Sequence, residues 1–446
     1  MTRLLPKVSH LVIVAGGKGV RLAAQFNDLP KVLVPVGGKP VLQHQLELAA
    51  AAGIDTVTIF AGHLAEKIQD FVGDGSRFGL KARILVEKEP LGNAGAVIQG
   101  LNSLPEHFFV VYGDVMLAVD LERMAEQHLE RGADFTTFAH PNDHPQDSDL
   151  LEIDADGWVS ALHTCPHPEG RFFANLVNAA LYVVRRDALH PWAAVRGPLD
   201  FTKDIMPGLL ARGGRILAYR SSEYIKDMGT PARLQRVEAD WQAGKLNLAN
   251  SSSNVPAVFF DRDGTLNIER GFLRAAEDLE LIAGTGAALR SLRQAGFRLV
   301  VLTNQPVIAR GEASEADVDA IHRRLEWELG KEGAYLDRIY LCPHHPDRGF
   351  PGERADLKID CDCRKPATGL FRRACEELGI DAASSWMIGD QTRDIEMARR
   401  AGLRSVLVRT GVAGGDKKFQ VAPDHVASDL SAAADFIVKQ REAEIS

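Results

Sequence analysis

Short runs of apolar and β-branched residues alternate along the chain with longer stretches in which apolar residues recur every three or four positions. The short runs predict buried strands, and the longer stretches predict helices packed against them. In the first half, strands are predicted over 11–15, 56–60, 83–87 and 108–112, with helices over 41–52, 64–71 and 95–101. Closer strand-like runs follow at 151–153, 159–162, 176–184 and 215–219. This alternation predicts an α/β fold with a mostly parallel sheet and a mixed-sheet extension.

Small and polar residues interrupt the pattern over 243–256, where the chain reads Asn250-Ser251-Ser252-Ser253-Asn254. Such a composition is typical of a linker. A new apolar run begins at 257, and strand–helix alternation continues to 408. We therefore predict two α/β domains, 1–243 and 256–446, joined by a linker over 244–255.

Composition narrows the class of protein. The chain has 446 residues, of which 45% are hydrophobic and 25% charged, so it has the apolar content of a folded protein. Its net charge of −8 argues against general nucleic-acid binding. No apolar stretch reaches the roughly 20 residues of a membrane helix, and the N-terminus lacks the apolar core of a signal peptide. We expect a cytoplasmic enzyme with neither a nucleic-acid nor a membrane partner.

A glycine-rich loop follows the first predicted strand: Ala15-Gly16-Gly17-Lys18-Gly19-Val20-Arg21. Glycines allow backbone N–H groups to converge on an anion, and the two cations add charge. The loop lacks the third glycine of the dinucleotide fingerprint, since Leu22 stands there, and it has no Gly-Lys-Ser/Thr. Taken alone, such a loop is more often an ordinary turn.

The loop gains meaning from Pro30-Lys31, Leu91-Gly92-Asn93-Ala94-Gly95 and Gly113-Asp114, which follow it in order. This combination resembles the sugar-1-phosphate nucleotidylyltransferases over most of residues 8–240. The resemblance implies a Rossmann-like (GT-A-like) mixed sheet and attack of a sugar 1-phosphate on the α-phosphorus of a nucleoside triphosphate. It implies that Ala15, Gly16, Gly17, Gly19 and Arg21 hold phosphates, Lys31 neutralises them, Gly92 and Asn93 line the nucleoside pocket, Asn178 contacts the sugar, and Asp114 and Asp227 bind Mg²⁺. Residues 162–168 depart from the family, whose Glu-Lys-Pro is absent there.

In the second half, two carboxylates stand two positions apart at the end of an apolar strand, in Phe259-Phe260-Asp261-Arg262-Asp263-Gly264-Thr265. This spacing directs both side chains to one face, where like charges are costly without a cation between them. One carboxylate can act as nucleophile and metal ligand, the other as general acid and then base.

Later motifs extend this opening. Thr303 ends an apolar strand, Arg364-Lys365 precedes a proline, and Gly389-Asp390 follows another apolar run. With Asp-x-Asp-Gly-Thr, these motifs resemble the haloacid-dehalogenase superfamily, which implies a three-layer α/β/α domain. The resemblance implies an Asp261 nucleophile, an Asp263 acid–base, phosphoryl contacts from Thr303 and Lys365, and Mg²⁺ on Asp261, the Asp263 carbonyl and Asp390. Substrate contacts are expected from Glu269, Arg270, Gly271, Phe272, Asn304, Gln305, Pro306 and Arg364, and Asp394 is expected to support the site.

Three of the cysteines in this domain indicate a metal site. Five cysteines are too few for a disulfide framework, and three of them, Cys342, Cys361 and Cys363, cluster beside histidines. With His344 they provide three thiolates and one imidazole, the ligand count of a closed structural Zn²⁺ site. His345 is the alternative imidazole, and His344 is preferred because Cys-x-His mirrors Cys-x-Cys.

Within the superfamily, residues 303–311 and 342–346 resemble the heptose 1,7-bisphosphate 7-phosphatases. Such a phosphatase and a transferase acting on a sugar 1-phosphate catalyse consecutive steps, so the leading hypothesis is an enzyme of nucleotide-heptose synthesis for surface polysaccharides. Its small-molecule partners would be sugar phosphates and a nucleoside triphosphate, with GTP inferred from the pairing. The alternatives are a hexose-1-phosphate transferase fused to a phosphatase of another specificity, such as histidinol phosphate, and one non-catalytic half that senses or scaffolds. The oligomeric state stays open, a homo-oligomer included.

Overall fold

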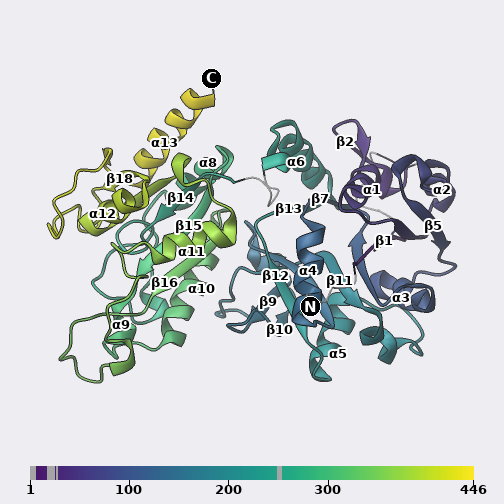
Figure 1. Ribbon diagram of the computed structural model, residues 1–446, viewed down its shortest axis with the longest axis horizontal. Coiled ribbons are helices and arrows are strands. Elements are labelled where there is room, and N and C mark those ends of the chain that lie inside the picture. The colour runs from purple at the N-terminus through teal and green to yellow at the C-terminus, as the bar shows by residue number, and fades with distance from the viewer. Residues whose placement is uncertain (1–6, 18–25, 27–28, 249–253, 446) are drawn as a thin grey trace, which may run out of the picture. The chain divides into compact units, whose positions relative to one another are not determined.

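The computed structural model describes residues 7–17, 26, 29–248 and 254–445. The chain forms two compact units, coloured from purple to teal and from teal to yellow in Figure 1. The first unit comprises Met1–His140, Leu151–Thr164 and Val177–Ser251, and the second Pro141–Leu150, Cys165–Leu176 and Ser252–Ser446.

The first unit is built on a nine-stranded mixed sheet. Its strands are β1 (His10–Ala15), β4 (Thr56–Ala61), β5 (Lys81–Val86), β6 (His107–Tyr112), β8 (Phe135–His140), β9 (Leu150–Ile153), β10 (Val159–His163), β11 (Val177–Arg185) and β12 (Ile216–Arg220). The order is β10-β9-β11-β6-β1-β4-β5, with β8 between β11 and β12. β6, β1, β4 and β5 run parallel, and β11 joins β6 antiparallel.

Helices and short ribbons complete this unit. The helices are α1 (Val41–Ala51), α2 (Ala65–Val72), α3 (Gly92–Gln99), α4 (Leu121–Arg131), α5 (Met206–Ala211), α6 (Pro231–Gln242) and α7 (Lys245–Leu248). β2 (Pro35–Val36) pairs with β3 (Lys39–Pro40), and β7 (Val115–Ala118) with β13 (Tyr224–Asp227). The buried faces of β1, β4 and β6 share one apolar cluster with α1 and α2.

The second unit is a six-stranded parallel sheet in the order β16-β15-β14-β17-β18-β19. Its strands are β14 (Ala257–Phe260), β15 (Arg298–Asn304), β16 (Arg338–Cys342), β17 (Trp386–Gly389), β18 (Arg404–Val408) and β19 (His425–Ala427). Its helices are α8 (Thr285–Gln294), α9 (Pro306–Ala309), α10 (Glu315–Lys331), α11 (Gly369–Leu378), α12 (Thr392–Ala401) and α13 (Leu430–Ile445).

Alternating residues of β14 show how the three layers form. Val258 and Phe260 pack with residues of α8, α10 and α13. Ala257 and Phe259 face the opposite way and pack with residues of α11 and α12. Because side chains alternate along a strand, β14 is buried on both faces, as a parallel sheet between two helix layers requires. The expected fold class of both domains is confirmed.

Two segments of the first half of the sequence fold into the second unit. They pack against α10: the Gln146 amide donates to the Trp327 carbonyl (2.9 Å), and the Asn175 N–H donates to Glu326 Oε2 (2.9 Å). Phe172 lies edge-on to Trp327. The second of these segments begins inside the 162–168 stretch that departs from the expected pattern, so that departure coincides with packing against α10 of the second unit.

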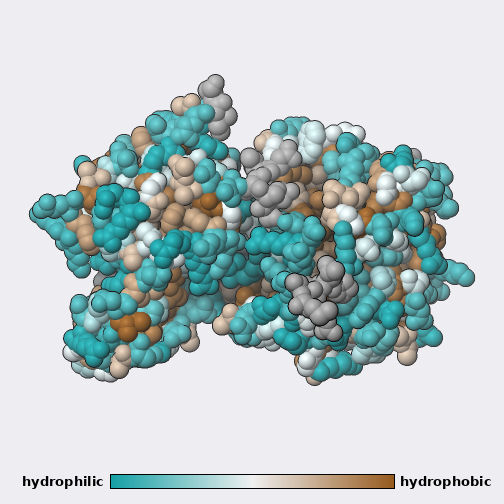
Figure 2. All heavy atoms as spheres, viewed as in Figure 1, coloured by the Kyte–Doolittle hydropathy of each residue, from teal (hydrophilic) through white to brown (hydrophobic). Residues whose placement is uncertain are grey.

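The expected elements agree with the strands and helices within a few residues, with one shift at α3. That helix begins at Gly92, three residues before the expected start, because Gly92 adopts a left-handed φ of +74° and turns the chain into the helix. Among the described residues, no helix is both long and apolar enough to cross a membrane. Hydrophilic residues dominate the face shown in Figure 2.

Candidate active sites and a candidate metal cluster

The two acids expected to bind Mg²⁺ in the first unit come from neighbouring strands. Asp114 follows β6 and precedes β7, while Asp227 ends β13. The β7–β13 pairing sets Asp227 opposite Val115, and the Met228 N–H donates to the Asp114 carbonyl (2.9 Å). The antiparallel ribbon therefore brings the two acids to one end of the unit.

Each of these acids is paired with a cation. Lys31 forms an ion pair with Asp114. Arg233 Nη1 lies 2.8 Å from both carboxylate oxygens of Asp227. A Cβ placed on Gly229 would lie 3.0 Å from Asp227 Oδ1 and 3.5 Å from Lys31 Nζ, so Lys31 and Asp227 flank the same glycine. A lysine and two acids thus gather where the resemblance places the reacting phosphates.

Glu87 is a candidate functional residue that the sequence analysis missed. It follows β5, and its Oε2 accepts from the Leu91 N–H (3.3 Å). Its Oε1 is buried and has no hydrogen-bond partner among the residues that the structure describes. A Cβ at Gly16 would collide with this oxygen, so the carboxylate lies against the start of the glycine loop. Burial raises the pKa of Glu87. Its place before Leu91-Gly92-Asn93 was the available signal.

Other residues expected in the nucleotide site lie at or near this loop. Ala15 ends β1, and Gly16 and Gly17 follow it. Gly19 and Arg21 lie outside the described residues. A Cβ at Gly92 would collide with the Leu199 backbone, so glycine is required there by close approach as well as by φ.

The two asparagines expected to contact nucleoside and sugar both have partners within the protein. Asn93 donates from Nδ2 to Asp200 (2.6 Å), and its Oδ1 accepts from the Phe201 N–H (2.8 Å). Asn178 accepts from Thr137 (2.6 Å) and donates to Thr202 (3.0 Å). Both amides therefore bind the protein's own strands and turns, which fixes their orientation.

In the second unit, Asp261, Lys365 and Asp394 form a buried charged cluster. Asp261 follows β14, and its N–H donates to the Ile388 carbonyl of β17 (3.0 Å), which sets it at the carboxyl edge of the sheet. Lys365 Nζ lies 2.9 Å from Asp261 Oδ1 and 2.8 Å from Asp394 Oδ1. Burial lowers the pKa of Lys365, but the two carboxylates outweigh it and the net shift is upward. The ammonium is therefore held charged beside the expected nucleophile.

Asp390 makes this cluster a candidate cation site. Carboxylate oxygens of Asp261, Asp390 and Asp394 lie within 4.8 Å of one another. Asp390 Oδ2 accepts from the Val412 N–H (2.7 Å), whereas its buried Oδ1 has no partner among the described residues. Burial, together with Asp261 and Asp394, raises the pKa of Asp390 to about 8. Lys365 pairs with only two of these three buried carboxylates, so a divalent cation fits the charge, and oxygen ligands suit Mg²⁺.

Asp394 has less capacity left for a metal than the other two acids. Its Oδ1 faces Lys365, and its Oδ2 accepts from the Gln391 N–H (3.1 Å) in the capping box of α12. Both oxygens are therefore engaged by the protein, which suits the supporting role expected for Asp394.

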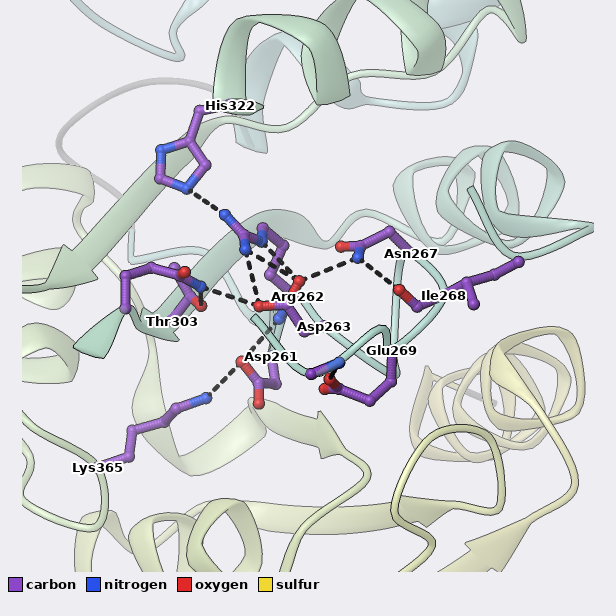
Figure 3. A network of polar contacts seen from close by, with 11 residues as sticks. Asp261, Arg262, Asp263, Asn267, Ile268, Glu269, Thr303, His322 and Lys365 are labelled. Carbon is purple, nitrogen blue, oxygen red and sulfur yellow. Dashed lines mark hydrogen bonds and ion pairs between the residues drawn. The ribbon is translucent and has the colours of Figure 1, made fainter. Parts of the chain in front are cut away.

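Asp263 and Thr303, both labelled in Figure 3, form a second polar network with Gln305. Gln305 Nε2 donates to Asp263 Oδ2 (2.9 Å) and lies 2.8 Å from Thr303 Oγ1. Burial raises the pKa of Asp263, but Arg262 and the donors Asn267 and Gln305 outweigh it, so the net shift is downward. Gln305 was expected to contact substrate, and in the structure it links the two expected catalytic groups.

Asn304 holds the main chain of Lys365. Its Nδ2 donates to the Lys365 carbonyl (3.1 Å), and its Oδ1 accepts from the Lys365 N–H (3.0 Å). This two-point contact joins the end of β15 to the lysine-bearing loop. Asn304 was expected to contact substrate, and no local sequence pattern predicts its contact with Lys365.

The remaining expected substrate contacts differ in exposure. Arg270 pairs with Glu280 at the surface (2.5 Å). Glu269 Oε1 accepts from the Gly271 N–H (2.5 Å), and burial beside Asp263 raises its pKa. Phe272 is partly exposed, and the Arg310 guanidinium lies 4.5 Å from its ring centroid.

Arg364 and Pro306 are more enclosed. Pro306 is buried at the start of α9. Arg364 Nη1 donates to the His344 carbonyl (3.0 Å). Burial lowers the pKa of Arg364, and the nearby Arg393 and Arg310 push it the same way against Cys342 and Cys361. This gathering of guanidinium groups favours an anion nearby.

The four residues expected to bind Zn²⁺ lie together in the structure. Cys342 ends β16, and its Sγ lies 3.6 Å from Cys361 Sγ and 3.2 Å from Cys363 Sγ. His344 Nδ1 lies 3.2 Å from Cys363 Sγ and 3.7 Å from Cys342 Sγ. A tetrahedral Zn²⁺ with Zn–S bonds of about 2.3 Å would separate its sulfur ligands by about 3.8 Å, close to these spacings.

His345, the alternative imidazole, points to other partners. Its Nε2 lies 3.4 Å from Arg310 Nη2 and 3.6 Å from an Asp347 oxygen. The cluster of three cysteines that could hold a metal ion therefore includes His344 and not His345.

Comparison with known proteins assigns both units to families. The nucleotidyl transferase family matches residues 10–243. A D-glycero-beta-D-manno-heptose-1,7-bisphosphate 7-phosphatase of Haemophilus ducreyi is 44% identical over 167 residues, which span 36% of this chain and 89% of the relative. The chain belongs to the nucleotidyl transferase family in its first half and to the family of these phosphatases in its second. The HAD-hydrolase-like family also matches residues 362–433.

Solved structures of both kinds are similar to the two halves. HddC from Yersinia pseudotuberculosis is 23% identical, covering 52% of this chain and all of that chain, with a TM-score of 0.46. The D,D-heptose 1,7-bisphosphate phosphatase from B. bronchiseptica is 31% identical, covering 42% of this chain and 99% of that one, with a TM-score of 0.37. The family membership of both halves confirms that the chain joins a nucleotidyltransferase to a phosphatase.

Proposed function

We propose that this enzyme makes a nucleotide-activated heptose in two steps. The phosphatase half removes the 7-phosphate of D-glycero-D-manno-heptose 1,7-bisphosphate, and the transferase half joins the resulting heptose 1-phosphate to a nucleotide, GTP being the donor. The product of the first reaction carries the group that attacks in the second. The names of two relatives support the heptose: the Haemophilus ducreyi phosphatase and one from Escherichia coli, 44% and 42% identical over the matched residues, are both heptose-1,7-bisphosphate 7-phosphatases.

The buried ion pair between Lys365 and Asp261 is the observation that carries the phosphatase chemistry. Asp261 attacks phosphorus, an Asp261 O–P bond forms, and the bond to the C7 oxygen breaks as Asp263 protonates that oxygen. Water then attacks the aspartyl-phosphate, giving its proton to Asp263 and releasing Asp261 and phosphate. Lys365 and Thr303 hold the phosphoryl oxygens throughout. Mg²⁺ held by Asp261, Asp390 and the Asp263 carbonyl would neutralise phosphoryl charge when bound.

A substrate with two phosphates suits the cations around this site. Lys365 serves the phosphoryl group that is transferred. Arg364 is adjacent in sequence, and Arg310 and Arg393 are near enough to depress its pKa. We assign the second phosphate, on C1, to Arg364 with this group of guanidiniums, because planar guanidinium groups bind phosphate oxygens in pairs.

In the transferase half, the sugar-phosphate oxygen attacks the α-phosphorus in line and pyrophosphate leaves. Positioning and charge neutralisation account for catalysis, so no covalent intermediate is needed. Lys31 neutralises phosphate charge once its pairing with Asp114 is exchanged for the nucleotide. Asp114 and Asp227 would hold Mg²⁺, which supplies charge neutralisation at the reacting phosphates.

Glu87 supports guanine as the base. A single carboxylate accepts two parallel N–H donors, and guanine presents such a pair on N1 and N2. Adenine offers an acceptor at N1, which the carboxylate would repel. Glu87 Oε1 lies against Gly16 and has no hydrogen-bond partner among the residues that the structure describes, and this observation favours a base with two adjacent N–H donors.

We propose Zn²⁺ as the ion of the Cys342, His344, Cys361 and Cys363 cluster. Four protein ligands with no open position are typical of a structural site. Because Cys363 is two residues from Lys365, the ion would fix the loop that carries the lysine.

Phosphorus NMR on the purified protein tests the two reactions together. The substrates are β- and α-heptose 1,7-bisphosphate with Mg²⁺, in parallel tubes containing GTP or ATP. We expect loss of the 7-phosphate signal, then growth of pyrophosphate and nucleotide-sugar signals in the GTP tube. Release of phosphate without a nucleotide-sugar would refute only the sugar or the nucleotide proposed for the transferase, and inertness of both anomers would refute the heptose.

A separate experiment tests Glu87 as the residue that recognises the base. Glu87→Gln should reduce the preference for GTP over ATP at least about 10-fold, whereas an unchanged preference would refute this role.

A further inference from the structure

Arg262, between the nucleophile and the acid–base residue, has a fully buried side chain. Its guanidinium folds back onto Asp263 (Figure 3). Nε donates to Asp263 Oδ1 at 3.1 Å, and Nη2 lies 2.9 Å from Oδ1 and 2.8 Å from Oδ2. A charge this deeply buried is costly unless it is paired, so Arg262 and Asp263 are held together by burial itself.

The fourth contact of this guanidinium is with His322. Arg262 Nη1 donates to His322 Nε2 at 3.2 Å, and His322 comes from α10, which packs over the network (Figure 3). A guanidinium has no acceptor, so the imidazole accepts at Nε2 and carries its proton on Nδ1. Burial and the adjacent Arg262 charge lower the pKa of His322 to about 3, in keeping with a neutral ring. His322 therefore fixes the direction of the guanidinium without adding charge.

Asp263 is thereby held from three sides. Besides Arg262, Asn267 Nδ2 donates to its Oδ1 (3.0 Å), and Gln305 Nε2 donates to its Oδ2 (2.9 Å). Asn267 and Gln305 are neutral, so Arg262 is the charged member of the set and the one that reaches both oxygens.

We propose that Arg262 and His322 are positioning residues, which hold the Asp263 carboxylate in the place from which it exchanges a proton with the leaving alcohol. The inference rests on the proposed phosphatase chemistry, in which Asp263 gives its proton to the C7 oxygen as the P–O bond breaks. Neither residue needs to touch substrate. Loss of either contact would let the carboxylate turn while leaving Asp261 and Lys365 in place.

The dependence of rate on the leaving group separates this role from a merely structural one. An alkyl alcohol needs a proton as it departs, whereas p-nitrophenolate leaves without one, so only the first requires a placed general acid. The experiment measures kcat/KM of the full-length enzyme for heptose 1,7-bisphosphate and for p-nitrophenyl phosphate. Asp263→Asn, which removes the acid, provides the reference ratio.

We expect Arg262→Lys to lower kcat/KM about 10²-fold on the heptose bisphosphate and less than about threefold on p-nitrophenyl phosphate. A lysine keeps the positive charge but lacks the planar guanidinium that contacts both oxygens of Asp263. Equal losses on both substrates, or no loss on either, would overturn the proposal. Circular dichroism and thermal unfolding check that the variants fold.

A pair of His322 variants keeps the test decisive if Arg262→Lys does not fold. His322→Leu removes the acceptor and should show the same selective loss, about 10-fold, whereas His322→Gln offers an amide oxygen and should recover most of it. Equal behaviour of the two variants would contradict the assignment of His322. If the wild-type enzyme ignores heptose 1,7-bisphosphate but hydrolyses glycerol 3-phosphate, the heptose proposal falls, and the same ratios are then measured with glycerol 3-phosphate.

Discussion

The two candidate active sites differ in how deeply some of their charges are buried. In the phosphatase site the side chains of Lys365 and Asp394 are 1% and 0% exposed. In the transferase site the side chains of Arg233 and Asp227 are 42% and 44% exposed. Buried charges attract strongly and keep one arrangement, while water screens exposed pairs and lets partners exchange.

This difference fits what each site has to bind. The phosphatase must receive one phosphoryl group in a place that is already set. In the transferase unit, Lys31 and Arg233 form ion pairs with the two acids proposed to hold Mg²⁺, so under that proposal nucleotide and metal would displace them. The phosphatase site is therefore preorganised, whereas the charges of the transferase site would regroup on binding.

The largest test of this comparison is to disable one site and measure the other. Asp261→Asn removes the proposed nucleophile while keeping the shape of the side chain. We expect hydrolysis of heptose 1,7-bisphosphate to fall at least about 10⁴-fold, with nucleotidyl transfer from supplied heptose 1-phosphate within about twofold of wild type. Phosphate release and pyrophosphate release are followed separately.

Asp227→Asn is the matched change in the transferase site, and it should reverse the pattern. Pyrophosphate release falls and phosphate release stays. A variant that lost both activities would contradict two separate sites and point to a shared structural defect.

The second test removes a ligand of the metal cluster. Cys361→Ser should weaken metal binding at least about 10²-fold and lower phosphatase activity, because the Lys365 loop loses its anchor. Metal content by mass spectrometry and both activities are measured. Cys375→Ser, a cysteine of α11 outside the cluster, serves as the control. Full activity in a metal-free Cys361→Ser enzyme would show that the buried site does not depend on the cluster.

The third test concerns the clamp on Lys365. Asn304→Ala removes two hydrogen bonds to the lysine main chain, so we expect kcat to fall about 10-fold on alkyl and aryl phosphates alike. The role proposed for Lys365 is to hold the phosphoryl group, which both substrates share. Asn304→Asp keeps the acceptor for the Lys365 N–H and should fall between alanine and wild type. A loss confined to alkyl phosphates would assign Asn304 to the proton-transfer network instead.

Much of both sites could be predicted because strand ends and short spacings carry their chemistry. Asp114 and Asp261 follow apolar runs that can only be buried strands, and parallel strands gather their carboxyl ends at one edge. Cys361-Asp362-Cys363 fixes two thiols by spacing alone. Such features are local in sequence and can be recognised without knowledge of how the elements pack.

The rest depends on contacts between residues far apart. The guanidinium of Arg262 reaches His322, 60 positions away, and Asn304 reaches Lys365, 61 positions away. No periodicity or spacing encodes such a meeting, because the packing of α10 and the loop after β16 decides it. Glu87 differs from these two, because its place before Leu91-Gly92-Asn93 was a local signal, although its approach to Gly16 is known only from the structure.

The smallest expected effect concerns burial in the core of the first unit, away from its candidate site. The first unit buries His128, whose ring contacts Thr136 (2.8 Å) and His107 (3.0 Å). Burial, with His107 and Arg185, lowers the pKa of His128 to about 3. In the unfolded chain this histidine binds a proton as the pH falls through about 6.5, whereas in the folded unit it stays neutral. The contribution of His128 to the free energy of unfolding is therefore fully present above about pH 6.5 and is lost progressively as the pH falls.

Between pH 6.5 and 5.5 the expected contribution is a loss of about 1 kcal/mol in the free energy of unfolding of this unit. Urea unfolding, followed through the transition that abolishes nucleotidyl transfer, measures it. His128→Gln should remove this part of the pH dependence, and His63→Gln, at an exposed position, should leave it unchanged. An unaltered slope in His128→Gln would mean that the ring is solvated. The predicted slope would show instead that the first unit has a dry core, in contrast to the exposed Arg233–Asp227 pair of its candidate site.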